Sequence, residues 1–139
     1  MTVKVNLDES RLQEIVQNAI NDGLLEAIGE TVVTTIQERF TDTNEAPDGE
    51  IWKPLSQFTL GMRRSRGDGS EKILINTGAL ETSITFQIVD NKVDIGTAIP
   101  YASKHNQGFG RIPKRQFIGE LNESDRNRVM QTIREFFEQ

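Results

Sequence analysis

Apolar residues recur at helical spacing through the first third of the chain. Residues three and four positions apart lie on one face of an α-helix, so this spacing predicts a helix whose apolar face supports the rest of the protein. Gly23 and Gly29 weaken the pattern, because a glycine inside a helix costs about 1 kcal/mol relative to alanine. We therefore predict either one long helix bent near Gly23 or two stacked helices. The apolar positions are Leu12, Ile15, Val16, Ala19, Ile20, Leu24, Ile28, Val32, Ile36 and Phe40.

A different period, of two residues, marks the neighbouring stretches 84–89 and 92–96. Alternating apolar and polar residues are the pattern of a half-buried strand. Asp90 and Asn91 lie between the two stretches, and both tolerate the positive φ of a tight turn. The sequence therefore predicts an antiparallel β-hairpin whose buried face consists of Ile84, Phe86, Ile88, Val93 and Ile95.

Both ends of the chain carry further predicted elements. Residues 3–7 alternate like a strand, and Asp8 or Ser10 could cap the helix that follows. Near the other end, Asn122 or Ser124 could cap a final helix. The apolar stripe of that helix comprises Val129, Met130, Ile133, Phe136 and Phe137.

Residues 41–72 are polar and rich in turn-forming residues. We interpret them as a long inserted loop with a flexible basic tip at residues 63–70, although loops of this length are uncommon in compact domains. The acidic residues of the segment do not form an EF-hand, because Pro47 and Lys53 stand where that calcium loop needs glycine and glutamate. Trp52 is expected to fill the protein's own core, with an interface anchor as the rarer alternative.

A short helical turn is predicted between this loop and the hairpin. It begins near Gly78, with Asn76 or Thr77 as its cap and Leu80 directed inward. Together the elements predict an α+β fold, in which a long N-terminal helix and a C-terminal helix pack on a small antiparallel sheet and a long loop is inserted. A length of 139 residues favours a single domain, 1–139.

Charge is distributed unevenly along the chain, whose net charge is −5. Residues 1–60 hold eleven acids and four bases, whereas residues 61–119 hold five acids and nine bases. An acidic protein is a poor general binder of nucleic acid, since affinity for phosphate depends on Lys and Arg. The basic central part could lie on an acidic protein surface or be a solvated face. The chain has no Cys, no signal-peptide pattern and no membrane-length apolar run, so we expect a soluble intracellular protein without membrane contact.

Candidate catalytic and cofactor chemistry is sparse. His105 is the only histidine, and Ser83 and Asp94 belong to residue types too common to identify a triad. We expect His105 to donate to backbone carbonyls of a loop instead. The chain lacks a phosphate-binding loop with its lysine, a dinucleotide fingerprint and zinc-ligand spacing. We therefore predict a protein that is not an enzyme, with no catalytic residue, no cofactor and no metal.

The stretch 101–119 gathers the only Tyr, the only His, three of the eleven Gly and a Pro, with no acidic residue. Glycine permits backbone angles that other residues avoid, so we predict a shaped loop here rather than a regular helix. Such a loop either folds back on the core or docks on a partner. The residues expected to shape it are Tyr101, His105, Gly108, Pro113 and Gly119.

This stretch resembles a motif of the phage virion morphogenesis family, the tail-completion proteins of contractile-tailed phages. Lys114 and Gln116 depart from that motif, which usually has a small residue and a proline there. The matching residues are Tyr101-Ala102, His105, Gly108, Ile112-Pro113, Arg115 and Phe117-Ile118-Gly119. The resemblance extends upstream to Trp52, Pro54, Leu55, Thr59, Ile73-Leu74, Thr77-Gly78, Leu80 and Ser83-Ile84.

The resemblance implies a structural protein at the neck or tail end of the virion, which completes the tail or joins it to the filled head. It would assemble in the host cytoplasm as a ring of copies, six if it follows the tail's symmetry, beside other neck, tail-tube or connector proteins. A ring needs contacts between unlike patches, and a basic lobe facing an acidic neighbour would supply them. The residues expected at or near these contacts are Trp52, Arg63, Arg64, Arg111, Lys114, Arg115 and Phe117.

Three alternatives stay open. The basic lobe could contact DNA through Arg63, Arg64 and Arg66, with binding that falls steeply as salt rises. The protein could instead terminate the tail at its proper length. A hydrolase using His105 would lose its activity, but not its fold, on His105→Ala. The ring hypothesis predicts that Arg115→Glu blocks assembly while leaving the fold intact.

Overall fold

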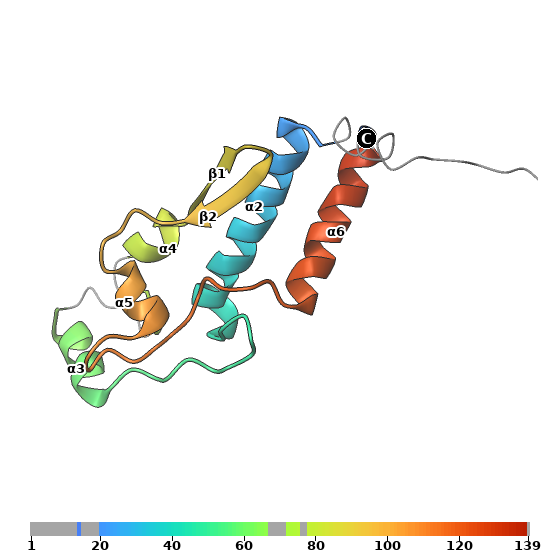
Figure 1. The fold of residues 1–139 in the computed structure, drawn as a ribbon. Coiled ribbons are helices and arrows are strands. Elements are labelled where there is room, and N and C mark those ends of the chain that lie inside the picture. Colours follow the sequence, from blue (N-terminus) through green and yellow to red (C-terminus); the bar gives the residue numbers. More distant parts are fainter. Residues whose placement is uncertain (1–13, 15–19, 67–71, 76–77, 139) are drawn as a thin grey trace, which may run out of the picture.

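The computed structural model describes residue 14 and residues 20–66, 72–75 and 78–138, with the backbone alone for residues 64–66. Helices and one antiparallel hairpin make up this part of the chain, which confirms the α+β class (Figure 1). The strand predicted at residues 3–7 and the helical pattern before residue 20 lie outside the described residues.

Helix α2 (Asp22–Glu38) is the central element. Asn21 caps it, because its side-chain oxygen accepts a hydrogen bond from the Leu24 N–H at 2.9 Å. Gly23 therefore lies in the first turn of a helix that starts at Asp22, and almost all the residues that would form a helix before it lie outside the described part of the chain. Gly29 lies on the buried face, where a Cβ atom would sit 2.4 Å from the Phe86 ring. Only glycine lets the hairpin come this close to the helix.

The hairpin forms as predicted. Strands β1 (Thr85–Val89) and β2 (Lys92–Gly96) pair antiparallel, with Phe86 opposite Ile95. The Asp90-Asn91 turn has φ values of 50° and 58°, in the left-handed region. The face toward α2 consists of Ile84, which is fully buried just before β1, and the half-buried Phe86, Ile88, Val93 and Ile95.

Short helix α4 (Ala79–Ser83) precedes the hairpin. It begins after Gly78, and Leu80 is buried as predicted. Gly78 has a φ of 83°, a conformation that glycine adopts without strain. The predicted caps at residues 76 and 77 lie outside the described residues.

Helix α6 (Glu123–Phe137) begins with a reciprocal capping box between Asn122 and Asp125, which confirms Asn122 as its cap. It packs along α2, where the Thr31 and Thr132 hydroxyls lie 2.7 Å apart. An ion pair between Glu38 and Arg128 at 2.6 Å also joins the two helices. Of the predicted apolar stripe, Val129, Ile133 and Phe136 are half-buried, whereas Met130 and Phe137 are exposed and correct the prediction.

Two segments predicted as loops contain helices. Helix α3 (Gln57–Arg66) lies inside the predicted loop 41–72, and it takes up part of the predicted flexible tip. Ser56 directly precedes it, and the Ser56 hydroxyl accepts a hydrogen bond from the Thr59 N–H at 3.2 Å. Helix α5 (Ala102–Gln107) opens the stretch 101–119, so only the remainder of that stretch is irregular. Both helices are short and mostly polar, so they lack the apolar period that predicts a helix.

A π-helical segment, η1 (Arg39–Thr43), continues α2 and ends at Asn44, which has a φ of 51°. The chain then folds back on itself, because the Trp52 N–H donates to the Asn44 carbonyl at 2.8 Å. An isolated bridge between Glu45 and Ile51 closes the same excursion. The part of the predicted loop before α3 is thus fixed by backbone hydrogen bonds.

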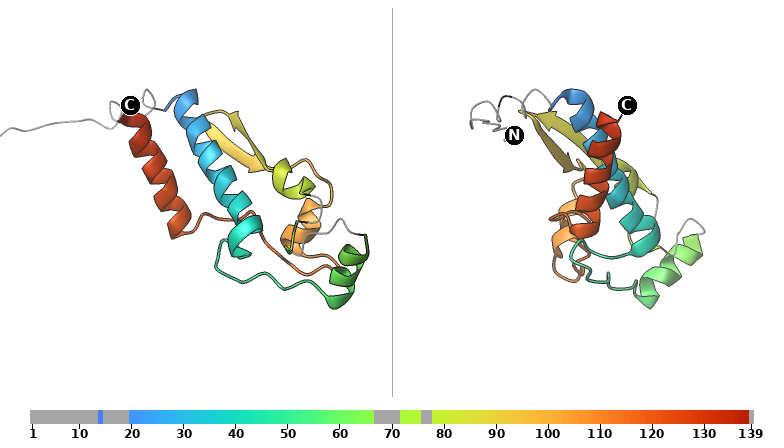
Figure 2. Two further views of the ribbon diagram at one scale, coloured as in Figure 1. Left: turned by 180° about the vertical axis from the view of Figure 1, so that it is seen from behind. Right: turned by 90° about the vertical axis from the view of Figure 1, so that its right-hand side faces the viewer.

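Helix α2 lies between the hairpin and α6, so α6 packs on the side of α2 away from the sheet (Figure 1). Views from behind and from the side show α3 and α5 at the end of the molecule remote from the hairpin turn, on opposite sides of that end in the side view (Figure 2). The core runs from α2 toward that end and contains Val32, Ile36, Phe40, Ala46, Trp52, Leu74, Leu80, Ile84, Ala102 and Phe117.

Candidate functional site

Three aromatic rings connect the α3–α5 end to the core. The Phe40 ring centroid lies 5.6 Å from that of Trp52 and 5.2 Å from that of Phe117. Trp52 is only 2% exposed, and its Nε1–H donates to the Gln116 carbonyl at 2.8 Å. The burial confirms the core interpretation of Trp52. Phe117 is buried beside it, so both rings lie inside the protomer.

Two of the arginines predicted as contact residues donate hydrogen bonds to backbone carbonyls. Arg115, which is 6% exposed, donates from Nε to the Lys53 carbonyl at 2.7 Å and from Nη2 to the Pro54 carbonyl at 3.1 Å. Arg63 is half-buried and donates to three carbonyls of residues 72–75, at 2.7–3.3 Å. Burial lowers the pKa of Arg115, and the nearby charge of Arg63 lowers it further. Both guanidinium groups therefore secure neighbouring segments of the same chain.

Sequence reasoning missed three residues with similar roles. Arg39 is buried and donates to the Phe117 carbonyl at 3.2 Å and to an oxygen of Asp125 at 2.6 Å. Asn106 accepts hydrogen bonds from the N–H groups of Phe117 and Ile118, at 2.9 and 3.0 Å. Asp125 had a signal in the sequence, since it stands three residues after the cap of α6. Nothing in the local sequence marked Arg39 or Asn106.

His105 and Tyr101 lie on the same side of α5. Their rings meet edge to face with centroids 5.9 Å apart, and Tyr101 is exposed. The carbonyl of His105, not its ring, accepts the hydrogen bond from the Arg115 N–H at 2.7 Å. Its buried Nδ1 has no hydrogen-bond partner among the described residues, which corrects the expectation of a donating ring. Burial lowers the pKa of His105, as does the charge of Arg115.

Two of the glycines in the loop lie close to other atoms. Gly108 has a φ of 82°, and a Cβ atom there would meet the backbone nitrogen of Lys114 at 3.2 Å. A Cβ atom at Gly119 would lie 2.5 Å from the side-chain nitrogen of Gln116. Pro113 is half-buried between these two positions. The positive φ and the backbone contact give Gly108 a physical reason to be glycine, whereas the flexible end of Gln116 could move away from a Cβ atom at Gly119.

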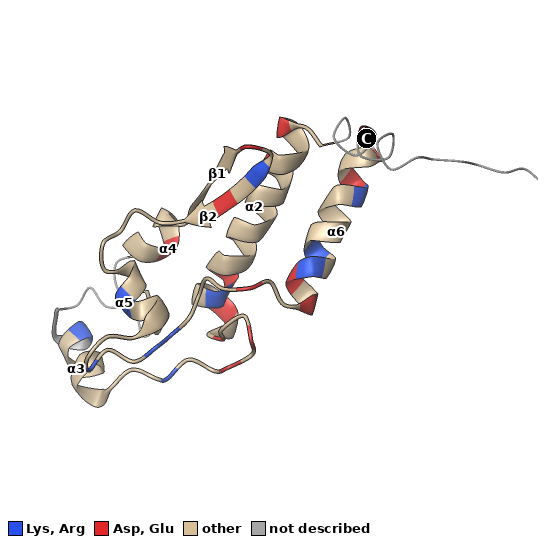
Figure 3. Cartoon of the chain, in the orientation of Figure 1, with Lys and Arg blue, Asp and Glu red and all other residues tan. Residues whose placement is uncertain are grey.

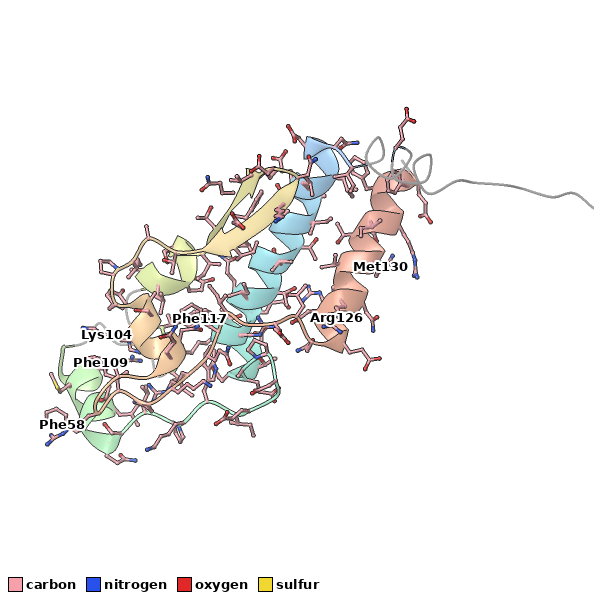
Figure 4. All side chains as sticks on the ribbon, in the orientation of Figure 1. Phe58, Lys104, Phe109, Phe117, Arg126 and Met130 are labelled. Atoms are coloured by element: carbon pink, nitrogen blue, oxygen red, sulfur yellow. The ribbon has the colours of Figure 1, made fainter. Side chains whose placement is uncertain are left out.

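Exposed cations and aromatic rings gather at the α3–α5 end. Phe58 on α3 is 77% exposed and Phe109 after α5 is 64% exposed, with the Lys104 ammonium 5.1 Å from the Phe109 ring centroid (Figure 4). A cavity of about 410 Å³ opens between residues 53–59 and 111–115, and no acidic side chain lines it among the described residues. We call this surface the basic-aromatic end and define it by Lys53, Phe58, Lys104, Phe109, Arg111 and Lys114, which are all exposed.

Acidic side chains gather elsewhere, around η1 and the start of α6 (Figure 3). The two segments that carry them are tied together, since the Asn122 side chain donates to the Pro47 carbonyl at 2.9 Å. Ile51, which is exposed, lies among these acids. We call this surface the acidic edge and define it by Asp42, Glu45, Asp48, Glu50, Ile51, Glu120 and Glu123, which are all exposed.

The structure thus separates the predicted contact residues into two groups. Trp52, Arg115 and Phe117 are buried, and Arg63 is half-buried. Arg111 and Lys114 remain exposed at the basic-aromatic end. The side chain of Arg64 lies outside the described residues, although its backbone belongs to α3.

The residues considered for catalysis do not meet in the described part of the chain. Ser83 shares a hydrogen bond with Thr97 at 2.6 Å, and Asp94 is exposed on β2. Among the described residues, no group of three or more His, Asp or Glu side chains could hold a metal ion. No described helix combines the length and apolar character needed to cross a membrane.

Comparison with known proteins identifies a protein family and a relative that matches part of the chain. The model of the phage virion morphogenesis family matches residues 4–138. A relative from Haemophilus influenzae, Mu-like prophage FluMu G protein 1, is 32% identical over 83 residues. That match covers 59% of this chain and 57% of the relative, so the chain spans little more than half of the relative's length. No solved structure gives a significant match.

Proposed function

We propose, from the premise that this chain belongs to the phage virion morphogenesis family, that it completes the tail or joins it to the filled head. The family makes it a structural protein of virion assembly. The finer proposal places it at the neck or tail end, where copies form a ring and contact other neck, tail-tube or connector proteins. Assembly would take place in the host cytoplasm, with six copies if the ring follows the tail's symmetry.

The observation that carries this proposal is the family match over residues 4–138, which includes both motif segments and the helices around them. The Mu-like prophage relative points toward the same kind of particle. The described surface fits a protein that binds other proteins, because large apolar side chains are exposed at several places.

The direct test is electron microscopy of particles made in cells that lack this protein. Separate filled heads and tails of normal length would support completion or joining. Tails of irregular length would instead identify a length terminator. Particles that are intact and infectious without the protein would refute the proposal, because a structural component of the neck cannot be dispensable for the joined particle.

Contact with DNA is the second candidate, and the cavity lined by Lys53, Arg63, Arg111 and Arg115 favours it. The acidic edge of the same protomer opposes it, since phosphate is repelled there. Phosphate contacts predict binding that weakens steeply with salt, and the exposed Arg111 and Lys114 are the residues to replace. Binding that is weak and unchanged in an Arg111→Ala/Lys114→Ala variant would exclude this candidate.

A further inference from the structure

We propose that the basic-aromatic end of one copy docks on the acidic edge of a second copy, in a head-to-tail contact. The inference rests on the proposed function, because it specifies the surfaces through which the ring would form. The two surfaces are different parts of one protomer, so the contact is heterologous and can repeat from copy to copy. Repeated contacts close into a ring when the rotation between neighbouring copies is a whole-number fraction of a full turn.

The first surface has an unbroken positive character. No acidic residue occurs at positions 52–67 or 95–119, the segments that build this end. Its exposed cations Lys53, Lys104, Arg111 and Lys114 therefore have no acid on the same segments to neutralise them. A field of one sign over a continuous surface attracts a surface of the opposite sign and fixes its register.

The second surface supplies the opposite charge. Six exposed carboxylates come from two segments, residues 42–50 and 120–123, which the hydrogen bond from Asn122 to the Pro47 carbonyl holds together. Two exposed cations, Lys53 and Arg126, each lie three residues from this group in the sequence. Figure 3 shows that the acids lie away from the α3–α5 end, so the two surfaces of one copy do not cover each other.

Apolar side chains lie within both charged surfaces. Phe58 and Phe109 project from the basic-aromatic end, and Figure 4 shows them on the same end as Lys104. Ile51 is 74% exposed among the acids. Protein contacts commonly have an apolar centre with a polar rim, and aromatic residues are enriched in that centre. We therefore place the aromatic rings against Ile51, with the charges around them.

Both surfaces are held in place before any partner arrives. A tight turn fixes Phe109, because its N–H donates to the Ile112 carbonyl at 3.0 Å and its carbonyl accepts from the Ile112 N–H at 2.8 Å. Arg115 fixes the carbonyl of Lys53. On the other surface, the bridge between Glu45 and Ile51 orders the excursion. Surfaces ordered in advance lose less conformational entropy on binding.

Charge reversal tests this contact in a phage whose gene for this protein is deleted and replaced by genes for variants of the protein. One variant reverses the basic-aromatic end with Arg111→Glu and Lys114→Glu. Another reverses the acidic edge with Glu50→Lys and Glu120→Lys. Like charges facing each other cost several kcal/mol, so each variant alone should reduce the yield of infectious particles about 100-fold or more. Circular dichroism and thermal unfolding check that each purified variant is folded.

Co-expression of the two variants gives the decisive result. Each reversed surface then finds a complementary reversed surface on the other variant, and each native surface finds its native counterpart. Alternating copies in a ring of even number should restore the yield to within about tenfold of wild type. A chain that carries all four substitutions should recover in the same way.

The control reverses two exposed cations on other elements, Lys92→Glu on β2 and Arg134→Glu on α6. Its net charge changes by the same amount as that of the Arg111→Glu/Lys114→Glu variant. It should assemble normally. Normal yield from both single-surface variants, or no recovery on co-expression, would overturn the proposed contact. A loss confined to the Arg111→Glu/Lys114→Glu variant, with no recovery, would point to DNA or another protein as the occupant. The proposed function fails separately, if particles lacking the protein are infectious.

Discussion

The two halves of the described fold are held by different kinds of interaction. The helix–hairpin half, made of α2, β1, β2 and α6, is held by regularly spaced apolar side chains on facing elements. The clamped end, made of residues 44–66 and 101–119, contains only short helices, and single side chains hold its backbone carbonyls and N–H groups. Regular spacing can be recognised in a sequence, whereas a single hydrogen bond over sixty residues cannot.

In the clamped end, the residues that stabilise the fold are different from the residues that are exposed for contact with a partner. In the clamped end, side chains directed inward fix the backbone, and the neighbouring side chains on that backbone point to solvent. Lys114 and Arg115 are adjacent in sequence, yet the first is exposed and the second is 6% exposed. The clamped end can therefore present a rigid surface without a regular element beneath it.

The largest expected effect comes from removing the aromatic side chain of Trp52, which joins the two halves. Trp52→Ala should lower the free energy of unfolding by about 3–5 kcal/mol, because it leaves a cavity beside Phe40 and Phe117. Trp52→Phe keeps a ring but loses the hydrogen bond to the Gln116 carbonyl, and should cost about 1 kcal/mol. Urea unfolding followed by circular dichroism measures both. A loss below about 1 kcal/mol for Trp52→Ala would show that the two halves are stable separately.

The adjacent cations Lys114 and Arg115 allow a direct comparison of an exposed and a buried side chain. Arg115→Met keeps much of the aliphatic stem but leaves the Lys53 and Pro54 carbonyls without their donor, so it should destabilise the protein by about 2–3 kcal/mol. Lys114→Met should change stability by less than about 0.5 kcal/mol, since its side chain is exposed. Equal unfolding midpoints for the two variants would contradict the clamp role.

This role changes what an Arg115→Glu variant can report. A carboxylate at a buried site that faces two carbonyls has neither a donor nor solvent, so the substitution should damage the fold itself. The sequence alone led to the opposite expectation, a fold left intact. Failed assembly in this variant would therefore not locate an interface, and Lys114→Glu is the substitution that can.

One glycine in each half provides a third test. Gly29→Ala places a Cβ atom 2.4 Å from the Phe86 ring and should cost about 1–2 kcal/mol in spite of alanine's better helix propensity. Gly61→Ala on α3 meets nothing within 4 Å and should stabilise the protein by up to about 1 kcal/mol. The combined variant Gly29→Ala/Phe86→Leu should lose less free energy of unfolding than the sum of the losses in the two single variants. Strict additivity would show that the ring is not the obstacle.

The sequence predicts the helix–hairpin half well because each element repeats a pattern. The alternation of residues 84–96 located both strands and the turn, and Asn122 marked the start of α6. Even there, the predicted apolar stripe of α6 includes more residues than the helix buries, because helical spacing does not show how far the contact with α2 extends. Met130 and Phe137 are apolar residues at the margin of that contact.

The clamped end shows why the rest was not predicted. Helix α3 has Phe58, Leu60 and Met62 two residues apart, a spacing that does not indicate a helix, and its start depends on the Ser56 hydroxyl. Arginines in the motifs could serve a partner or their own chain equally well, and only the fold decides between these. The exposed Arg111 and the buried Arg115 illustrate both outcomes four residues apart.

The smallest expected effect is a pH dependence from the clamped end. Burial and the charge of Arg115 lower the pKa of His105 from 6.5 in the folded state, while the unfolded chain keeps the ordinary value. As pH falls below 6.5, the unfolded state binds a proton before the folded state does, so the free energy of unfolding should decrease until pH reaches the lowered pKa. The helix–hairpin half has no histidine of its own, because His105 is the only histidine of the chain.

The matched variant is His105→Gln, which removes the titrating ring and retains a polar side chain. Its unfolding midpoint should change less than that of the wild type between about pH 7 and about pH 5.5, while carboxylates such as Glu38 affect both proteins alike. The pKa of Glu38 is lowered by its hydrogen bond to Arg128, so its contribution is lost only at more acidic pH, as pH falls through that lowered value. Identical slopes in the two proteins would mean that the ring of His105 titrates in the folded protein as it does in the unfolded chain.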